Sequence, residues 1–392
     1  KNYFQITTGD EERRRREKIT GKVLTLDRGL EDTLPYLFTL LGVVEPTATI
    51  AQMDAHIRKR RTLDAIKRLL VRESLNQPLI VIFEDLHWLD AETQAFLSLF
   101  SDSIATAKIL LLTNYRPEYQ HEWGNKLFFS QVRLDPLRQA DAEEMLTALL
   151  GDTGGTAASL HDLRQLILEK TDGNPFFMEE IVQELREQGF LAVGTSTAVT
   201  MPTELRLPPT VQGILAARID RLPTREKAFL QMLSVLGEEM PLSLIRQVSG
   251  ATDDDLHRAL AHLQTAEFIH ERPAFPEPEY TFKHALTQEV AYNSLLIERR
   301  KVLHERTARI IESLFATNRE DYYETLAHHY RCSGNTEKAI EYLHLAGQQA
   351  VRRSATADAI TFLTSALDLL DTLPDTPDRA RHELTLQLAL GP

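Results

Sequence analysis

Two short, uninterrupted runs of apolar residues constrain the fold of this chain more than any other feature. Residues 79–83 (Leu-Ile-Val-Ile-Phe) form the first run, and residues 108–113 form the second after an intervening helical pattern. A run without polar positions predicts a strand that is buried on both faces, which is typical of parallel sheets. The order strand, helix, strand therefore predicts a βαβ unit.

Two acids, Glu84 and Asp85, follow the first predicted strand directly. The carboxyl ends of parallel strands form the edge at which open α/β sheets bind ligands. Carboxylates there can bind Mg²⁺, a hard cation that prefers oxygen, and can orient the water that attacks a γ-phosphate. Spacing alone leaves the alternative open that these acids only cap the next helix.

Arg116 follows the second predicted strand. A planar guanidinium suits bidentate contacts with phosphate. An isolated arginine at such a position is more often a surface residue, but the neighbouring acidic strand end favours a phosphate contact.

Composition narrows the class of protein. The chain has 392 residues and a formal net charge of −13, from 44 Lys and Arg against 57 Asp and Glu, which argues against nucleic acid as a partner. Its single cysteine, Cys332, cannot form an internal disulfide, and no Cys/His cluster at zinc spacing is expected. No apolar window is long enough to cross a membrane. We therefore expect no membrane partner and a cytoplasmic location.

The pattern after residue 135 changes to helices at 139–150, 159–171 and 176–188, with a break at 172–175. A Pro-rich stretch at 191–208 predicts a domain boundary. Three further helices and two short strands, at 267–271 and 279–282, then predict a winged helix. Residues 205–290 carry 9 Lys and Arg against 12 Asp and Glu, so we expect this module to pack within the protein rather than bind DNA.

Beyond His284 the chain is predicted to be helical to its end. Tyr323, Leu326, Ala327, Tyr330, Ala339, Leu343 and Ala346 fit the positions of a tetratricopeptide repeat. Ala359 echoes Ala339 after about 20 residues instead of about 34, so an ordinary helical hairpin stays an alternative. Such stacks offer a concave face to a protein or peptide.

Four segments together carry a resemblance to a known family: residues 84–90, 114–118, 173–177 and 280–287. They resemble the AAA-like ATPase region of signal-transduction ATPases with numerous domains, the STAND class. The set fused behind class III adenylate/guanylate cyclase domains in bacteria is the most similar. The resemblance runs from about residue 20 to about residue 370.

The resemblance implies an α/β plus all-α fold. Its parts are an incomplete P-loop NTPase parallel sheet with a helical lid, a winged-helix domain and a tetratricopeptide-like α-solenoid. The implied domains are residues 1–135 for the NTPase core, 136–200 for the lid, 201–300 for the winged helix and 301–392 for the repeats.

The resemblance also implies roles for individual residues. Glu84 and Asp85 match the Walker B acids, one for Mg²⁺ and one to polarise water, and Arg116 matches an arginine that senses the γ-phosphate of ATP. Asn174 and Pro175 match a lid turn near adenine, for which a plain helix-breaking turn is the alternative.

His284 matches a histidine on the β-phosphate of ADP, for which a structural histidine is the alternative. We expect His87 and Trp88, which follow Leu86, to serve packing.

One departure from the family is large, because the chain has no Gly-x-x-x-x-Gly-Lys-Ser/Thr loop to hold phosphates. Gly21-Lys22 is the only Gly-Lys pair, and its neighbours do not fit. We expect this loop, and any cyclase domain, to lie upstream in a longer protein.

The predicted function is therefore a fragment of a multidomain signalling ATPase that uses ATP/ADP and Mg²⁺ as a regulatory switch, with ATPase activity only in the full-length protein. Its expected partners are an upstream cyclase or other output domain, a protein on the repeats, and further copies in a nucleotide-dependent homo-oligomer. The alternative is a non-catalytic helical-repeat scaffold.

Overall fold

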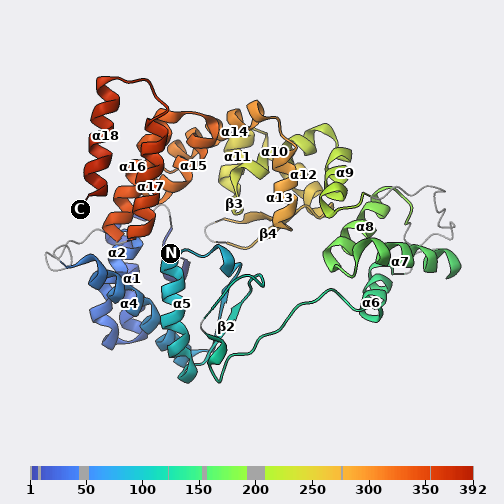
Figure 1. The fold of residues 1–392 in the computed structure, drawn as a ribbon, viewed down its shortest axis with the longest axis horizontal. Coiled ribbons are helices and arrows are strands. Elements are labelled where there is room, and N and C mark those ends of the chain that lie inside the picture. The colour runs from blue at the N-terminus through green and yellow to red at the C-terminus, as the bar shows by residue number, and fades with distance from the viewer. Residues whose placement is uncertain are drawn as a thin grey trace. The chain divides into compact units, whose positions relative to one another are not determined.

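The computed structural model describes residues 2–7, 10–43, 53–121, 123–151, 157–191, 208–274, 277–353 and 355–391. Most of these residues are helical, with small sheets (Figure 1). They form two compact units, Lys1–Gln131 with His304–Pro392, and Val132–Leu303. Most of the predicted boundary, residues 192–207, lies outside the described residues, and the division into four domains stays a prediction. Within the described ranges, no helix has both the length and the apolar composition needed to cross a bilayer.

The first unit begins with helices that pack around one apolar cluster. These are η1 (Asn2–Phe4), α1 (Glu12–Leu26), η2 (Arg28–Thr33), α2 (Leu34–Leu41) and α4 (Ala55–Asn76). Ile19, Val23 and Leu37 are buried at its centre, at the helical spacing that the sequence shows. Arg68 fixes α4 to η2 through two hydrogen bonds to the Asp32 carboxylate, at 2.8 and 3.0 Å.

The predicted βαβ unit follows in the first unit and is confirmed. It consists of β1 (Leu79–Phe83), η3 (Leu86–Trp88), α5 (Ala91–Ser103), η4 (Ile104–Thr106) and β2 (Ile109–Thr113). The two strands are parallel, with Leu79 opposite Ile109 and Phe83 opposite Thr113.

The prediction that these strands are buried on both faces is wrong for the described structure. One face packs against the cluster of Leu86, Leu97 and Trp123. The other face is exposed: Ile80, for example, keeps 67% of its surface accessible, and Ile82, Leu110 and Leu112 are exposed beside it. An apolar run thus marked a sheet of which only one face is covered by the described residues.

The remainder of the first unit is a stack of helices. It contains part of α14 (Ile297–Leu314), η6 (Ala316–Tyr322), α15 (Tyr323–Ser333), α16 (Thr336–Arg353), α17 (Thr356–Leu370) and α18 (Pro377–Leu390). Gly347 lets α16 and α17 lie side by side, because a Cβ there would come within 2.7 Å of the Leu363 side chain (Figure 1). Buried alanines such as Ala339 and Ala346 serve the same close packing. The tetratricopeptide-like helical architecture is therefore confirmed.

The second unit starts with the three predicted helices, α6 (Gln139–Leu150), α7 (Ala157–Thr171) and α8 (Pro175–Glu187). The two predicted strands are present as β4 (Ile269–Arg272) and β5 (Glu279–Phe282), and a third strand, β3 (Met240–Pro241), was not predicted. The helices of this part are α9 (Val211–Arg221), α10 (Thr224–Leu236), α11 (Leu242–Ser249), α12 (Asp253–Thr265) and α13 (Ala285–Asn293). The strands pair antiparallel in the order β3-β5-β4. The assignment of these elements to a winged helix stays a prediction.

A buried arginine ties α8 to α9 inside the second unit. Arg218 is 1% exposed, donates to Glu187 Oε1 at 2.7 Å and to the carbonyl of Ala266 at 2.7 Å, and pairs with Glu180. Burial alone would lower the pKa of Arg218, but Glu187 and Glu180 raise it overall. The guanidinium is therefore charged. Its ion pairs join α9, which follows the Pro-rich stretch, to α8, which precedes it.

Candidate functional site

Asn114 holds the carboxyl ends of β1 and β2 side by side. Its side-chain Oδ1 accepts a hydrogen bond from the backbone N–H of Asp85 at 2.7 Å. Its own N–H donates to the carbonyl of Phe83 at 3.2 Å, and its carbonyl accepts from Leu86 at 3.0 Å. These three bonds fix the turn that carries Glu84 and Asp85 against the start of the segment that carries Arg116.

Asp85 adopts a left-handed backbone conformation, with φ of 54°. Asp and Asn are enriched in this region among residues other than glycine, and strained backbone positions cluster at functional sites. The turn reverses the chain out of β1 into η3 and leaves the side chains of Glu84 and Asp85 exposed. Two oxygen-rich groups are thus presented at the carboxyl edge of the sheet, which is the donor set that Mg²⁺ prefers.

Arg116 lies at the same edge of the sheet. Its guanidinium carbon is 5.7 Å from the centroid of the Trp88 ring, which is a cation–π contact. Trp88 itself is 71% exposed, so the expectation that it serves packing is wrong for the described residues. Trp88 instead offers its ring to the Arg116 guanidinium.

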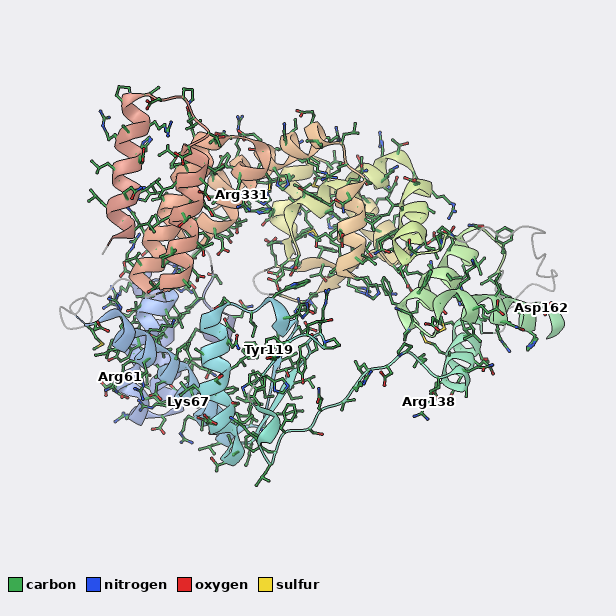
Figure 2. All side chains as sticks on the ribbon, viewed as in Figure 1. Arg61, Lys67, Tyr119, Arg138, Asp162 and Arg331 are labelled. Carbon is green, nitrogen blue, oxygen red and sulfur yellow. The ribbon has the colours of Figure 1, made fainter. Side chains whose placement is uncertain are left out.

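An aromatic cluster supports the segment after β2. The Tyr115 hydroxyl is 2.8 Å from His121 Nε2, and the Tyr119, His121 and Trp123 rings continue the cluster. Tyr119 is labelled in Figure 2. Beside Trp88, both ring nitrogens of His87 are buried and have no hydrogen-bond partner among the described residues. A buried polar group without a partner is uncommon and is typical of a place where a further group binds.

The turn at residues 172–175 lies in the second unit and requires a glycine at position 173. Gly173 has φ of 71°, and a Cβ there would come within 2.4 Å of the carbonyl oxygen of Leu137. Asn174 caps α8 by accepting a hydrogen bond from Phe177 N–H at 3.1 Å, and Pro175 is the first helical residue. The alternative from the sequence, a turn that ends one helix and caps the next, is therefore present in the structure.

His284 packs beside this turn. Its ring centroid is 4.0 Å from that of Phe176, the residue after Pro175. His284 Nε2 is buried and has no hydrogen-bond partner in the described part of the chain. Burial lowers the pKa of His284, and the charge of Lys283 lowers it further. The ring is therefore neutral near pH 7.

The six predicted residues fall into two groups. Glu84 and Asp85 follow β1 and Arg116 follows β2 at one edge of the sheet in the first unit. In the second unit, His284 contacts Phe176, the residue after the 174–175 turn. Sequence reasoning missed Asn114 as the residue that joins the strand ends, although its position directly after a parallel strand was the available signal.

A groove of about 880 Å³ opens between α6 and α7 next to Gly173. Glu143, Glu144, Glu169 and Asp172 line it, against Arg164 and His161. Because the lining carboxylates outnumber the cationic groups, the groove repels phosphates.

Comparisons with known proteins show only limited similarity to this chain. No family model matches the chain. An uncharacterized protein of Rhizobium meliloti (strain 1021) is 28% identical over 341 residues, which cover 86% of this chain and 32% of that protein. This chain thus spans about a third of the length of the curated relative it matches.

A solved structure gives a second comparison. It is the crystal structure of a signal-transduction ATPase with numerous domains that carries a tetratricopeptide repeat sensor, from Pyrococcus horikoshii. It has a TM-score of 0.46 and 12% sequence identity, and the match covers 93% of this chain and 56% of that one. A TM-score of this size does not establish a common fold.

Proposed function

We propose that this chain is part of a signalling ATPase in which Glu84, Asp85 and Arg116 face the terminal phosphate of Mg²⁺-bound ATP. One observation carries the proposal: Asn114 holds an exposed acidic pair and an arginine at the same edge of a parallel sheet. In this arrangement either carboxylate can hold Mg²⁺ while the other orients water, and Arg116 stabilises negative charge on the phosphate. ATP hydrolysis then serves as a regulatory switch.

The exposed sheet face supports a longer functional protein. Ile80, Ile82, Leu110 and Leu112 form one apolar surface on β1 and β2. Parallel sheets are usually covered on both faces, and a bare apolar patch commonly marks an interaction site. We propose that another part of the full-length protein covers this face and supplies the phosphate-binding loop.

The second group completes the proposed switch. His284 is a neutral imidazole whose Nε2 is buried without a hydrogen-bond partner among the described residues, which suits a hydrogen bond to the β-phosphate of ADP. The backbone at Asn174 and Pro175 would contact the adenine. The proposed partners are an upstream class III cyclase or other output domain, a protein or peptide on the helical repeats, and nucleotide-dependent copies of the protein in the cytoplasm.

The test is ATP binding and turnover by the full-length protein, wild type against Arg116→Ala. We expect turnover to fall by about tenfold or more, because the arginine acts on charge that develops in the transition state. Arg13→Ala, which alters an exposed arginine paired with Glu17, is the matched control. Unchanged turnover in Arg116→Ala would remove this residue from the site.

A non-catalytic scaffold is the second candidate, and one observation favours it. Gly21 and Lys22, the only Gly-Lys pair, lie inside helix α1 and not in a loop between a strand and a helix. This chain therefore has no phosphate loop of its own. A full-length protein that binds no ATP but still binds a partner through the repeats would establish the scaffold.

A further inference from the structure

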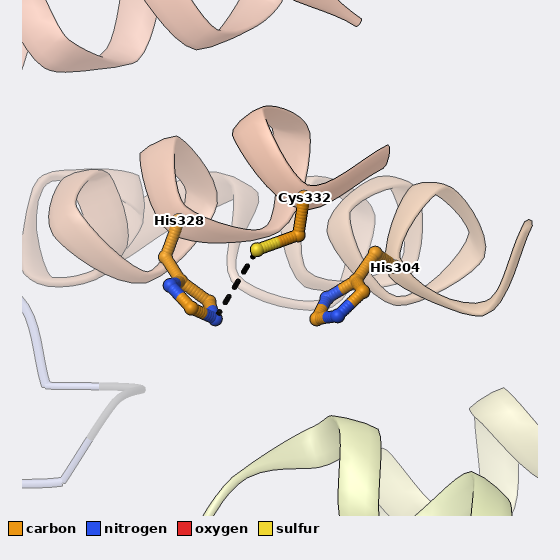
Figure 3. A group of neighbouring side chains, drawn as sticks. All are labelled: His304, His328 and Cys332. Carbon is orange, nitrogen blue, oxygen red and sulfur yellow. Dashed lines mark hydrogen bonds between the residues drawn. The ribbon is translucent and has the colours of Figure 1, made fainter. Parts of the chain in front are cut away.

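Three side chains of metal-ligating types converge in the first unit. His304 comes from α14, while His328 and Cys332 lie one turn apart on α15 (Figure 3). One ligand atom from each residue lies within 4.8 Å of the other two. The sequence shows no Cys/His cluster at zinc spacing, because one of these side chains comes from a different helix and short-range spacing cannot reveal it.

The two helices hold these residues in place. His304 Nδ1 is 2.8 Å from Nδ1 of the buried His329, which fixes the orientation of the His304 ring. One position along α14, Glu305 accepts hydrogen bonds from Ser333 at 2.9 Å and from Asn335 at 3.2 Å. Contacts on neighbouring positions thus lock α14 against α15, so the ligands are positioned before any ion arrives.

One ligand distance is close to that of a tetrahedral centre. Cys332 Sγ lies 3.8 Å from His328 Nε2. Bonds from Zn²⁺ to sulfur and to imidazole nitrogen are about 2.3 and 2.1 Å, which puts the two ligand atoms about 3.6 Å apart. The distances from these atoms to His304 are at most 4.8 Å, so coordination needs the His304 side chain to move by about 1 Å or less.

The ligand types select the ion. Two imidazoles and one thiolate are borderline to soft donors, which suit Zn²⁺ and disfavour Mg²⁺ and Ca²⁺. His304 is buried, Cys332 is half-buried and His328 is exposed, so the group can be reached from solvent. A fourth coordination position would remain for water or for a side chain of a partner.

We propose that His304, His328 and Cys332 bind one Zn²⁺ ion. On binding, the Cys332 thiol gives its proton to solvent and its sulfur bonds to the metal, while each imidazole donates a nitrogen lone pair. The ion joins α14 to α15 and stiffens the beginning of the helical stack. This site does not depend on the proposed ATPase function.

The experiment uses the whole chain, freed of metal with a chelator and titrated with Co²⁺ alone and with Zn²⁺ alone. Tetrahedral Co²⁺ bound to a thiolate gives a sulfur-to-cobalt charge-transfer absorption, and competition with a chromophoric chelator gives the zinc affinity. We expect one equivalent of each metal and a charge-transfer band that Cys332→Ser abolishes. His328→Gln should weaken zinc binding by about tenfold or more.

Two further variants make the test specific. His257→Gln changes an exposed histidine on α12 and should leave the zinc affinity within about twofold, because single surface histidines bind zinc weakly. His304→Gln also breaks the bond to His329, so circular dichroism must show that it folds before its affinity is compared. The proposal is overturned if wild type gives no charge-transfer band, or if Cys332→Ser and His328→Gln both bind zinc as wild type does.

Discussion

At the scale of single residues, Asn114 and Gly173 each satisfy two local requirements at once. Asn114 uses its backbone and its side chain together to join two strand ends. Gly173 combines a left-handed conformation with a close approach to Leu137. Both positions follow from local geometry, so their substitution has effects that can be stated in advance.

Asn114→Ala should lower the free energy of unfolding by about 1 kcal/mol, because the N–H of Asp85 loses its acceptor. Urea denaturation of the purified chain measures this change. Asn114→Asp keeps an acceptor oxygen and is the matched control, with a smaller loss expected. Equal losses in the two variants would mean that the side-chain hydrogen bond does not stabilise the turn.

Gly173→Ala should destabilise the second unit by about 3 kcal/mol or more, since the new Cβ meets the Leu137 carbonyl and the backbone is left-handed. Gly334 is left-handed, with φ of 84°, but a Cβ there meets nothing within 4 Å. Gly334→Ala should therefore cost only about 1 kcal/mol. Thermal unfolding of both variants separates the steric clash from the conformational strain.

At the scale of elements, charged side chains buried between helices set how those helices join. Arg218 fastens α9 to α8 through Glu180 and Glu187. Glu312 on α14 accepts hydrogen bonds from tyrosines on α15 and α16. Arg218 is buried and Glu312 is partly buried, so the polar partners of each charge decide how much the contact between the helices is stabilised.

Arg218→Met should lower the free energy of unfolding by about 3–5 kcal/mol, because it leaves the buried Glu180 carboxylate without its partner. Lys227→Met, which breaks a pair with the exposed Asp220, is the control and should cost no more than about 1 kcal/mol. Chemical denaturation of the two variants gives the comparison. A loss in Arg218→Met as small as in the control would contradict a structural role for the network.

The stability that Glu312 contributes through its hydrogen bonds to Tyr330 and Tyr342 should depend on pH. Burial alone would raise the pKa of Glu312, but hydrogen bonds from Tyr342 and Tyr330 and the charge of Lys338 lower it overall, below an ordinary value of 4.5. The unfolded chain therefore takes up the proton first as pH falls. The stabilisation is complete above about pH 4.5 and is lost progressively below it.

Denaturation at several pH values, with Glu312→Gln as the comparison, measures this dependence. The wild type should lose more stability than the variant between pH 5 and acid conditions, by at most about 1.4 kcal/mol per pH unit. Parallel profiles for the two proteins would show that Glu312 titrates alike in the folded and unfolded chain.

At the scale of the whole molecule, the sequence predicted what local patterns determine. The βαβ unit, the three helices after residue 135 and the small antiparallel sheet have ranges close to those expected, because apolar periodicity and turn residues act over short distances. The acids and Arg116 could be assigned to one sheet edge for the same reason. The exposure of Trp88 could not, since the packing around it depends on other elements.

The features that the sequence did not predict all join distant segments. Asn114 contacts Asp85 across 29 positions, and Arg218 reaches Glu180 across 38. The cluster of His304, His328 and Cys332 exists only because α14 and α15 pack together. Burial of the sheet was predicted wrongly because an apolar run indicates that both faces of a strand favour burial, but it does not indicate which segment packs on each face.

The uncovered face of β1 and β2 also bears on how this chain behaves when it is produced by itself. Four large aliphatic side chains in contact with water are expected to draw chains together as their concentration rises, and to attract chaperones that hold unfinished proteins. Replacing Ile82 and Leu110 with threonine keeps the β-branched or strand-compatible shape while reducing the drive to associate, which light scattering can follow. Any binding study on the isolated chain is best begun with such a variant, so that aggregation is not mistaken for specific binding.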